Sequence, residues 1–230
     1  MFVHGAGGNR LLWGSVMASL APSQACVAID LPGHGRSDGP GLGSVSAYAE
    51  NCAGFVTKLG LGPAILAGHS MGGGVAMSMA LTRPELVRAL VLVSTGARLR
   101  VAPGILEGLK SDFEGSAGAF AAYACGSDAP TRVTNVCLKG LLSAGPATLG
   151  GDLEACDRFD VRAELGSIRS ATLVICGDND LLTPLKYSQY LASGIAGASL
   201  TVVRGAGHMV MLQAPHTVAE SIAAFLSELP

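Results

Sequence analysis

Apolar residues along this chain form short unbroken runs, separated by segments of helical character. A strand needs a continuous apolar run, rather than an alternating one, when helices cover both faces of its sheet. The runs are ACVAID (25–30), PAILAG (63–68), ALVLVS (89–94), ATLVIC (171–176) and SLTVVR (199–204). We therefore predict an α/β fold with a mostly parallel sheet, flanked by helices at about 45–60, 71–82, 184–195 and 215–229.

Residues 97–168 interrupt this rhythm, because they are rich in Gly and Ala and show no clear buried strand. Three prolines divide the segment: Pro103, Pro130 and Pro146. We predict a mostly helical insertion at 97–168 within a core domain formed by 1–96 and 169–230. Its apolar positions could face a site or form the insertion's own core: Ile105, Leu109, Phe113, Phe120, Tyr123, Leu138 and Leu141.

Composition narrows the class of protein. With 230 residues, 49% of them hydrophobic, the chain can bury a substantial core. A net charge of -2 without runs of like sign gives no electrostatic basis for binding nucleic acid or a membrane surface. No apolar run approaches the roughly 20 residues of a membrane-spanning helix, and no signal peptide is evident, which predicts a cytoplasmic protein. If the start is truncated, a signal peptide upstream of it would not be covered by this prediction.

The six cysteines occur singly, without a CxxC pair. This spacing indicates neither a zinc site nor a redox motif. We expect them to be reduced and mostly buried, as small apolar side chains are.

Ser70 lies between a predicted strand that ends near Ala67 and a predicted helix that begins near Met71. The surrounding GHSMG places Gly68 and Gly72 two positions away on either side, where larger side chains would collide across a sharp turn. The pattern is typical of a nucleophile elbow, in which a strained backbone exposes the serine hydroxyl above the sheet. The alternative is a glycine-rich turn with an incidental serine.

A serine hydroxyl attacks at neutral pH only when a base takes its proton, and a third group must orient that base. His208 fits best, because it follows the last predicted strand on a glycine-flanked loop. Asp178 and Asp180 follow the preceding strand in CGDNDLLTP, and either could orient the imidazole. We expect His69 to point away from Ser70. The other histidines are expected to be structural or solvated: His4, His34 and His216.

Five segments in this order resemble motifs of the α/β-hydrolase superfamily and together span nearly the whole chain. They are HGAGG (4–8), DLPGHGRSD (30–38), GHSMGG (68–73), GDNDLLTP (177–184) and GAGHMVMLQAP (205–215). The order Ser, Asp, His along the chain is also that of the family. The resemblance implies an α/β-hydrolase fold in which 97–168 is a helical cap.

Carried over to the matching positions, the resemblance implies that Ser70 is the nucleophile and His208 the general base. It implies that Asp180, in preference to the earlier aspartate of that turn, orients the imidazole. The backbone N–H groups of Ala6 and Met71 would form the oxyanion hole. No metal or organic cofactor is implied, and the substrate-binding residues are left open.

The sequence departs from the family pattern at its beginning. Family members carry a β-hairpin before the strand that leads into the His-Gly loop, whereas only three residues precede His4. We therefore expect the hairpin to be missing and the strand at 25–30 to become a sheet edge with unpaired backbone groups. A second copy of the chain could cover that edge and so form a homo-oligomer.

The leading hypothesis is a serine hydrolase that cleaves a small or medium, largely uncharged carboxylic ester through an acyl-enzyme. The serine argues against haloalkane dehalogenase and epoxide hydrolase chemistry, whose enzymes of this fold use an aspartate nucleophile. Lactonase, carbon–carbon bond hydrolase, thioesterase and lyase activities remain open, and LVSTGARLRV (92–101) resembles capped esterases and enol-lactone hydrolases. A slow-turnover receptor for a small ligand and an inactive structural subunit are the alternatives from other classes.

Overall fold

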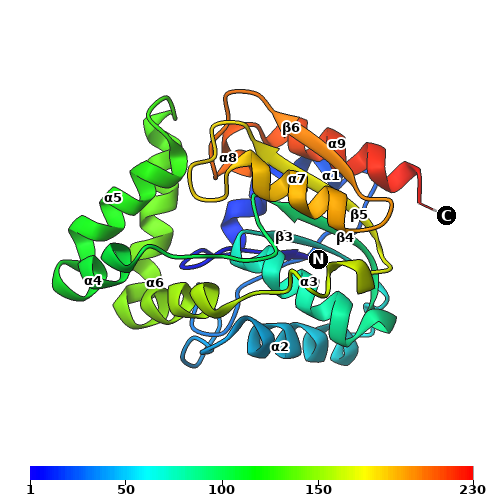
Figure 1. Ribbon diagram of the computed structural model, residues 1–230, viewed down its shortest axis with the longest axis horizontal. Coiled ribbons are helices and arrows are strands. Elements are labelled where there is room, and N and C mark those ends of the chain that lie inside the picture. Colours follow the sequence, from blue (N-terminus) through cyan, green and yellow to red (C-terminus); the bar gives the residue numbers. More distant parts are fainter. Residues whose placement is uncertain (230) are drawn as a thin grey trace.

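The computed structural model describes residues 1–229, and a six-stranded parallel sheet forms its centre in the order β2-β1-β3-β4-β5-β6 (Figure 1). The strands are β1 (Phe2–Val3), β2 (Ala28–Ile29), β3 (Ala64–His69), β4 (Val87–Val93), β5 (Ala171–Gly177) and β6 (Ser199–Val203). The four later apolar runs correspond to β3–β6, which confirms the predicted parallel sheet. The run at 25–30 contributes only the two residues of β2, so this strand is shorter than predicted.

Helices cover both faces of the sheet. One face carries α1 (Gly14–Leu20) and α9 (Pro215–Ser227), while the other carries α2 (Val45–Lys58), α3 (Met71–Thr82) and α7 (Leu185–Gly194). Short elements complete the core domain: η1 (Arg10–Trp13), η2 (Pro84–Leu86), η3 (Leu165–Ser167) and α8 (Val210–Gln213). The four predicted helices are present, but α1 was not predicted, because only Val16 and Leu20 form its buried side.

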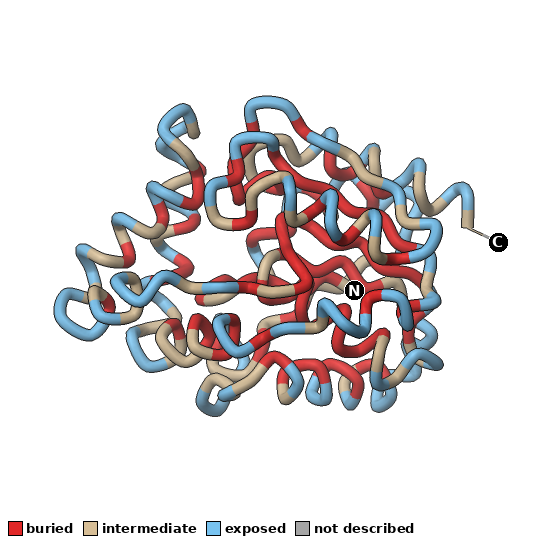
Figure 2. The backbone as a smooth tube through the Cα atoms, in the orientation of Figure 1, coloured by how far each residue is buried: buried red, intermediate tan, exposed pale blue. Residues whose placement is uncertain are grey.

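Side chains of the central strands alternate between two hydrophobic clusters, one on each face of the sheet. In β4, Leu90 and Leu92 join the cluster beneath α2, α3 and α7, whereas Val91 and Val93 join the one beneath α1 and α9. Figure 2 shows the buried residues concentrated along these strands. Burial on both faces is the reason that the strands appear in the sequence as unbroken apolar runs.

Between β4 and β5 the chain leaves the sheet and forms α4 (Pro103–Ser111), α5 (Phe113–Cys125) and α6 (Thr131–Arg158), which lie together to one side in Figure 1. The prolines mark their limits. Pro103 begins α4, Pro130 directly precedes α6, and Pro146 follows a kink in α6. At the kink, Gly145 adopts a φ of 77°, a conformation that favours glycine.

The position of β1 determines where the functional loops meet. Although it has only two residues, β1 lies between β2 and β3, and Val3 pairs with Gly68. The loop at 4–8 therefore emerges beside the end of β3, and β2 becomes the sheet edge, as expected. Because all strands are parallel, the loops after β1, β3, β5 and β6 converge at one edge of the sheet.

Residues 1–229 contain no cluster of His, Cys, Asp and Glu arranged to hold a metal ion. All six cysteines are free thiols, and five of them are buried. None of the helices in the described part of the chain is long and apolar enough to cross a membrane.

Candidate active site

Ser70 occupies the turn between β3 and α3 with an unusual backbone conformation. Its φ of 53° and ψ of -117° lie in a region that costs a non-glycine residue on the order of 1–3 kcal/mol. A Cβ atom at Gly68 would overlap the carbonyl of Gly72, and one at Gly72 would overlap the carbonyl of Val3. The Thr95 hydroxyl donates a 2.7 Å hydrogen bond to the carbonyl oxygen of Ser70 and supports the turn. The sharp turn that the sequence predicted is present, and both glycines are required by its close backbone contacts.

His208 and Asp180 form a buried pair in the loops that follow β6 and β5. The imidazole Nδ1 lies 2.9 Å from Oδ2 and 3.1 Å from Oδ1 of the carboxylate, and the two residues are 4% and 3% exposed. The carboxylate orients the ring through Nδ1, and Nε2 has no partner among residues 1–229. Asp178 is exposed and instead accepts a 2.7 Å hydrogen bond from the N–H of Gly205. The structure thus brings Asp180, rather than Asp178, to the histidine.

The turn at 180–183 holds the carboxylate of Asp180. The N–H groups of Leu182 and Thr183 donate to Oδ1 at 2.9 and 2.8 Å, and the Thr183 hydroxyl donates to Oδ2 at 2.8 Å. Burial would raise the pKa of Asp180, but His208 and these donors lower it below its ordinary value. The carboxylate is therefore charged at neutral pH. The role of Thr183 was not predicted, although a threonine shortly after an aspartate is a typical turn signal.

His69 was expected to point away from Ser70, yet it borders the same cavity and packs against His208. The two ring centroids are 4.7 Å apart, and Nε2 of His69 donates a 3.0 Å hydrogen bond to the carbonyl oxygen of His208. Burial, followed by the proximity of His208, lowers the pKa of His69 to about 3. The neutral ring therefore fixes the backbone of His208, a contact that the sequence pattern did not predict.

The loop after β1 contributes backbone rather than side chains to the site. Residues 5–8 all line the cavity, and a Cβ atom at Gly5 would lie 2.8 Å from Nδ1 of His69. Among residues 1–229, no hydrogen-bond acceptor is paired with the N–H of Ala6 or with that of Met71. These two donors come from different loops, which the pairing of β1 with β3 brings close together.

A second buried carboxylate, that of Asp152 in α6, anchors this loop. Its Oδ2 accepts hydrogen bonds from the N–H of Gly7 at 2.9 Å and from Nε2 of His34 at 2.8 Å, and its Oδ1 accepts one from the Tyr48 hydroxyl at 2.7 Å. His34 Nδ1 lies 3.0 Å from the carbonyl oxygen of Pro32, so both ring nitrogens face acceptors. Burial, the largest single influence, would lower the pKa of His34, but the hydrogen bond and charge of Asp152, together with the backbone bonds to Pro32 and Leu31, raise it above its ordinary value. The pair is therefore ionic.

His4 supports the same region from the other side. Its Nδ1 donates to the carbonyl oxygen of Gly5 at 2.8 Å, and its Nε2 accepts a hydrogen bond from the N–H of Leu31 at 3.0 Å. Burial lowers the pKa of His4 to about 4, which keeps the ring neutral. His4 and His34 thus hold their loops, as expected from the sequence.

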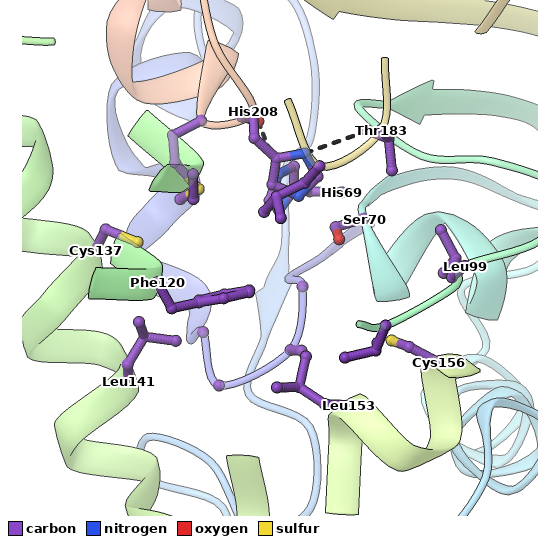
Figure 3. A pocket seen from close by; sticks show the side chains of 18 of the residues that line it. His69, Ser70, Leu99, Phe120, Cys137, Leu141, Leu153, Cys156, Thr183 and His208 are labelled. Carbon is purple, nitrogen blue, oxygen red and sulfur yellow. Dashed lines mark hydrogen bonds between the residues drawn. The ribbon is translucent and has the colours of Figure 1, made fainter. Parts of the chain in front are cut away.

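Ser70 and His208 border one cavity, shown in Figure 3 between the end of β3 and the helices of the insertion. Arg100 is the only residue lining it that carries a permanent charge. Most of the other lining side chains are apolar, among them Leu12, Leu99, Val101, Ile105, Phe120, Leu141 and Leu153. This arrangement places a strained serine, the His208 imidazole and the unpaired N–H of Ala6 around a largely apolar space.

The insertion's apolar positions divide between the cavity and the insertion's own packing. Ile105, Phe120 and Leu141 line the cavity (Figure 3 labels the latter two), whereas Leu109 is buried elsewhere and Tyr123 is 49% exposed. Some of these residues therefore face the cavity, and others pack within the insertion.

Comparison with known proteins agrees with this geometry. The alpha/beta hydrolase family model matches residues 1–221. The pimeloyl-[acyl-carrier protein] methyl ester esterase of Neisseria meningitidis serogroup C is 32% identical over 225 residues, which cover 91% of this chain and 86% of that protein. The enzyme of the same name from Yersinia pseudotuberculosis (strain PB1/+) is 30% identical over 243 residues, covering 99% and 93%.

Solved structures give the same result. A thermophilic esterase is 37% identical with a TM-score of 0.89, covering 99% of this chain and 89% of its own. A hydrolase from Pseudomonas aeruginosa PA01 is 25% identical with a TM-score of 0.88, covering 98% and 88%. The enol-lactonase of Burkholderia xenovorans LB400, at 22% identity and a TM-score of 0.90 over 99% and 90%, shows likeness of fold alone. The chain is therefore a member of the alpha/beta hydrolase family.

Proposed function

We propose that the protein is a serine hydrolase that cleaves a small or medium, largely uncharged carboxylic ester through an acyl-enzyme on Ser70. The observation that carries the proposal is the His208–Asp180 pair, whose histidine borders the same cavity as the strained Ser70. The relatives named as esterases support ester hydrolysis as the class of reaction. The largely apolar lining of the cavity supports a substrate with little charge near the ester.

In the proposed reaction, Nε2 of His208 takes the hydroxyl proton of Ser70 as the oxygen attacks the ester carbonyl. Asp180 holds the imidazole through Nδ1 and stabilises the imidazolium that forms. The N–H groups of Ala6 and Met71 then donate to the oxyanion, where each such donor contributes roughly 3 kcal/mol in related chemistry. His208 returns the proton to the departing alcohol, and a water molecule activated by the same histidine releases the acid.

Residues 97–168 would serve as the cap of this site. The segment that precedes α4 contributes Leu99, Arg100 and Val101 to the cavity. The helices α4, α5 and α6 contribute further residues, among them Ile105, Phe120 and Leu141. The carbonyl oxygen of Ala124 in α5 accepts a 2.9 Å hydrogen bond from the N–H of His208. A cap in this position would exclude water and shape the pocket for the acyl or alcohol group.

The proposal is tested by hydrolysis of p-nitrophenyl esters from acetate to octanoate by the wild type and by Ser70→Ala. We expect turnover that disappears in the variant, with a chain-length optimum that reports the size of the pocket. Folded Ser70→Ala with wild-type turnover would overturn the assignment of the nucleophile. Folded wild type that binds esters but does not hydrolyse them would favour the receptor hypothesis, and turnover of lactones alone would favour a lactonase.

Two further expectations stay predictions: a cytoplasmic location, and association of two copies through the edge strand β2.

A further inference from the structure

A second cavity, beside the active site, is lined by cationic and aromatic side chains. We call it the basic groove and define it by the residues that line it: Ala97, Arg98, Arg100, Arg162, Lys186, Tyr187 and Tyr190. The whole chain carries a net charge of -2, so four cations around one cavity are not a consequence of overall composition. No Asp or Glu is among the residues that line it.

Local structure explains why these side chains meet. The chain bends at Ala97, and Arg98 then forms a single antiparallel β-bridge with Asp160, which is a pairing of extended backbone. Side chains two positions apart on an extended chain point to the same side, so Arg98 and Arg100 face the groove together while Leu99, between them, is buried. In α7, Lys186, Tyr187 and Tyr190 are spaced at i, i+1 and i+4, which places them on one side of the helix.

The positive charge of the groove is only partly neutralised. Asp160 contacts both Arg162, at 2.6 Å, and Arg98, at 3.7 Å, so one carboxylate serves two guanidinium groups. Within the described part of the chain, neither Arg100 nor Lys186 forms a hydrogen bond or an ion pair, and both are exposed. Two cations in the groove are therefore available to an external anion.

Arg100 joins the groove to the active site. It lines the basic groove, the cavity that contains Ser70, and a third cavity formed with Ile105, Phe120 and Leu182. The basic groove and the cavity that contains Ser70 therefore adjoin at the side chain of Arg100. A permanent positive charge therefore borders a pocket whose other lining side chains are largely apolar.

We propose that the basic groove binds an anionic group, a carboxylate or a phosphate, at the end of the substrate remote from the ester. This inference rests on the proposed ester hydrolase function and refines the substrate: uncharged around the ester, negatively charged at its far end. Arg100 and Lys186 supply the unpaired cations, and guanidinium groups suit both oxyanions because they can donate two parallel hydrogen bonds.

The direct test measures binding to the Ser70→Ala protein, in which no turnover complicates the result. Isothermal titration calorimetry compares methyl esters that end in a carboxylate with methyl esters of the same length that end in a methyl group, over chains of about four to ten carbons. We expect the carboxylate series to bind about tenfold more tightly at one preferred length. The difference should shrink as salt is raised, because exposed charges are screened.

Substitutions locate the effect. Arg100→Gln and Lys186→Gln, each added to Ser70→Ala, should remove most of the preference for the charged ester. Lys58→Gln, which removes an exposed lysine of α2 that lines none of these cavities, should retain it. Equal affinity for charged and uncharged esters, or a preference that survives both groove substitutions, would overturn the proposal.

A phosphate-terminated methyl ester distinguishes the two kinds of anion, since whichever series binds more tightly identifies the group. The outcome is also separable from that for the proposed function. Hydrolysis of uncharged p-nitrophenyl esters that depends on Ser70, together with no preference for anionic esters, would leave the esterase proposal standing and overturn the anion site. Tighter binding of anionic esters to Ser70→Ala, together with a wild type that hydrolyses no ester, would support the anion site and overturn the esterase proposal.

Discussion

His208 with Asp180 and His34 with Asp152 are two buried histidine–carboxylate pairs whose closest contacts measure 2.9 and 2.8 Å. All four residues are buried. The two pairs differ in the surroundings of the second ring nitrogen. In His34 it faces the carbonyl oxygen of Pro32, whereas the hydrogen bonds of the His208 ring all involve Nδ1, and the ring borders the cavity that contains Ser70.

The comparison teaches that a short histidine–carboxylate contact does not by itself identify a catalytic base. A ring whose two nitrogens both donate is an imidazolium and cannot take a proton, whereas Nε2 of His208 has no partner among residues 1–229. Asp152 also differs from Asp180 in its partners, since it accepts bonds from Gly7, His34 and Tyr48 and so ties three segments of the core domain to α6. We infer that the first pair performs proton transfer and the second positions the loop at 4–8.

Exchanging each histidine for glutamine should give the largest contrast. His208→Gln is expected to lower kcat for p-nitrophenyl acetate by about 10⁴-fold, because it removes the base that we propose for Ser70, while the urea unfolding midpoint changes little. His34→Gln should lower kcat far less but cost about 3 kcal/mol of unfolding free energy, because it leaves Asp152 without its cation. Folded His34→Gln protein with no activity, beside active His208→Gln, would reverse the two assignments.

The two carboxylates should differ in the same way as the histidines: replacing Asp180 should lower kcat far more than replacing Asp152. Asp180→Asn is expected to lower kcat by about 10³–10⁴-fold, because the amide no longer enforces the productive tautomer of His208. Asp152→Asn should reduce kcat by about tenfold with little change in KM, because the N–H of Gly7 is held less firmly beside Ala6, which we propose as an oxyanion donor. Steady-state kinetics on both variants measures the split. Wild-type kcat in Asp152→Asn would show that this network does not position the loop.

A smaller effect is expected for Tyr48, whose hydroxyl donates a hydrogen bond to Asp152 of the second pair. Tyr48→Phe removes a hydroxyl that donates to the buried carboxylate of Asp152 at 2.7 Å and also accepts from the N–H of Leu42 at 2.9 Å. We expect a loss of about 1.5–3 kcal/mol in unfolding free energy, measured by urea denaturation. Tyr123→Phe is the matched control, because Tyr123 is 49% exposed, and it should unfold like the wild type. Equal stability of the two variants would contradict the network.

The smallest expected signal is the pH dependence of the ionic pair. The pKa of His34 in the folded protein is raised above its ordinary value of 6.5, so its contribution to stability is complete below about pH 6.5 and is lost as the pH rises through the raised value. The neighbouring ring of His4, with its pKa lowered to about 4, stays neutral over that range. The difference in unfolding free energy between wild type and His34→Gln should therefore shrink from pH 6 to pH 9. A difference that grew with pH would contradict an ionic pair.

The sequence predicted those features whose cause is local. Unbroken apolar runs predicted β3, β4 and β5, since burial on both faces requires them. Gly68 and Gly72 predicted the turn at Ser70 because their side-chain positions are filled by backbone. By contrast, β1 has only two residues and could be placed only through the resemblance to a family.

The features that escaped prediction depend on contacts between distant segments. Asp152 meets Gly7, His34 and Tyr48 across separations of 145, 118 and 104 residues, and no pattern in the sequence links them. His69 likewise depends on a carbonyl group 139 residues away. Such partners become visible only when the fold is known.

Labelling with a fluorophosphonate, followed by peptide mass spectrometry, tests the central claim most directly: His208, and not His34, activates Ser70. The wild type and folded His34→Gln should be modified at Ser70 at similar rates, His208→Gln at least about a thousandfold more slowly, and Ser70→Ala not at all. Equally fast modification of Ser70 in His208→Gln, or a wild type that the reagent leaves unmodified at Ser70, would contradict the account.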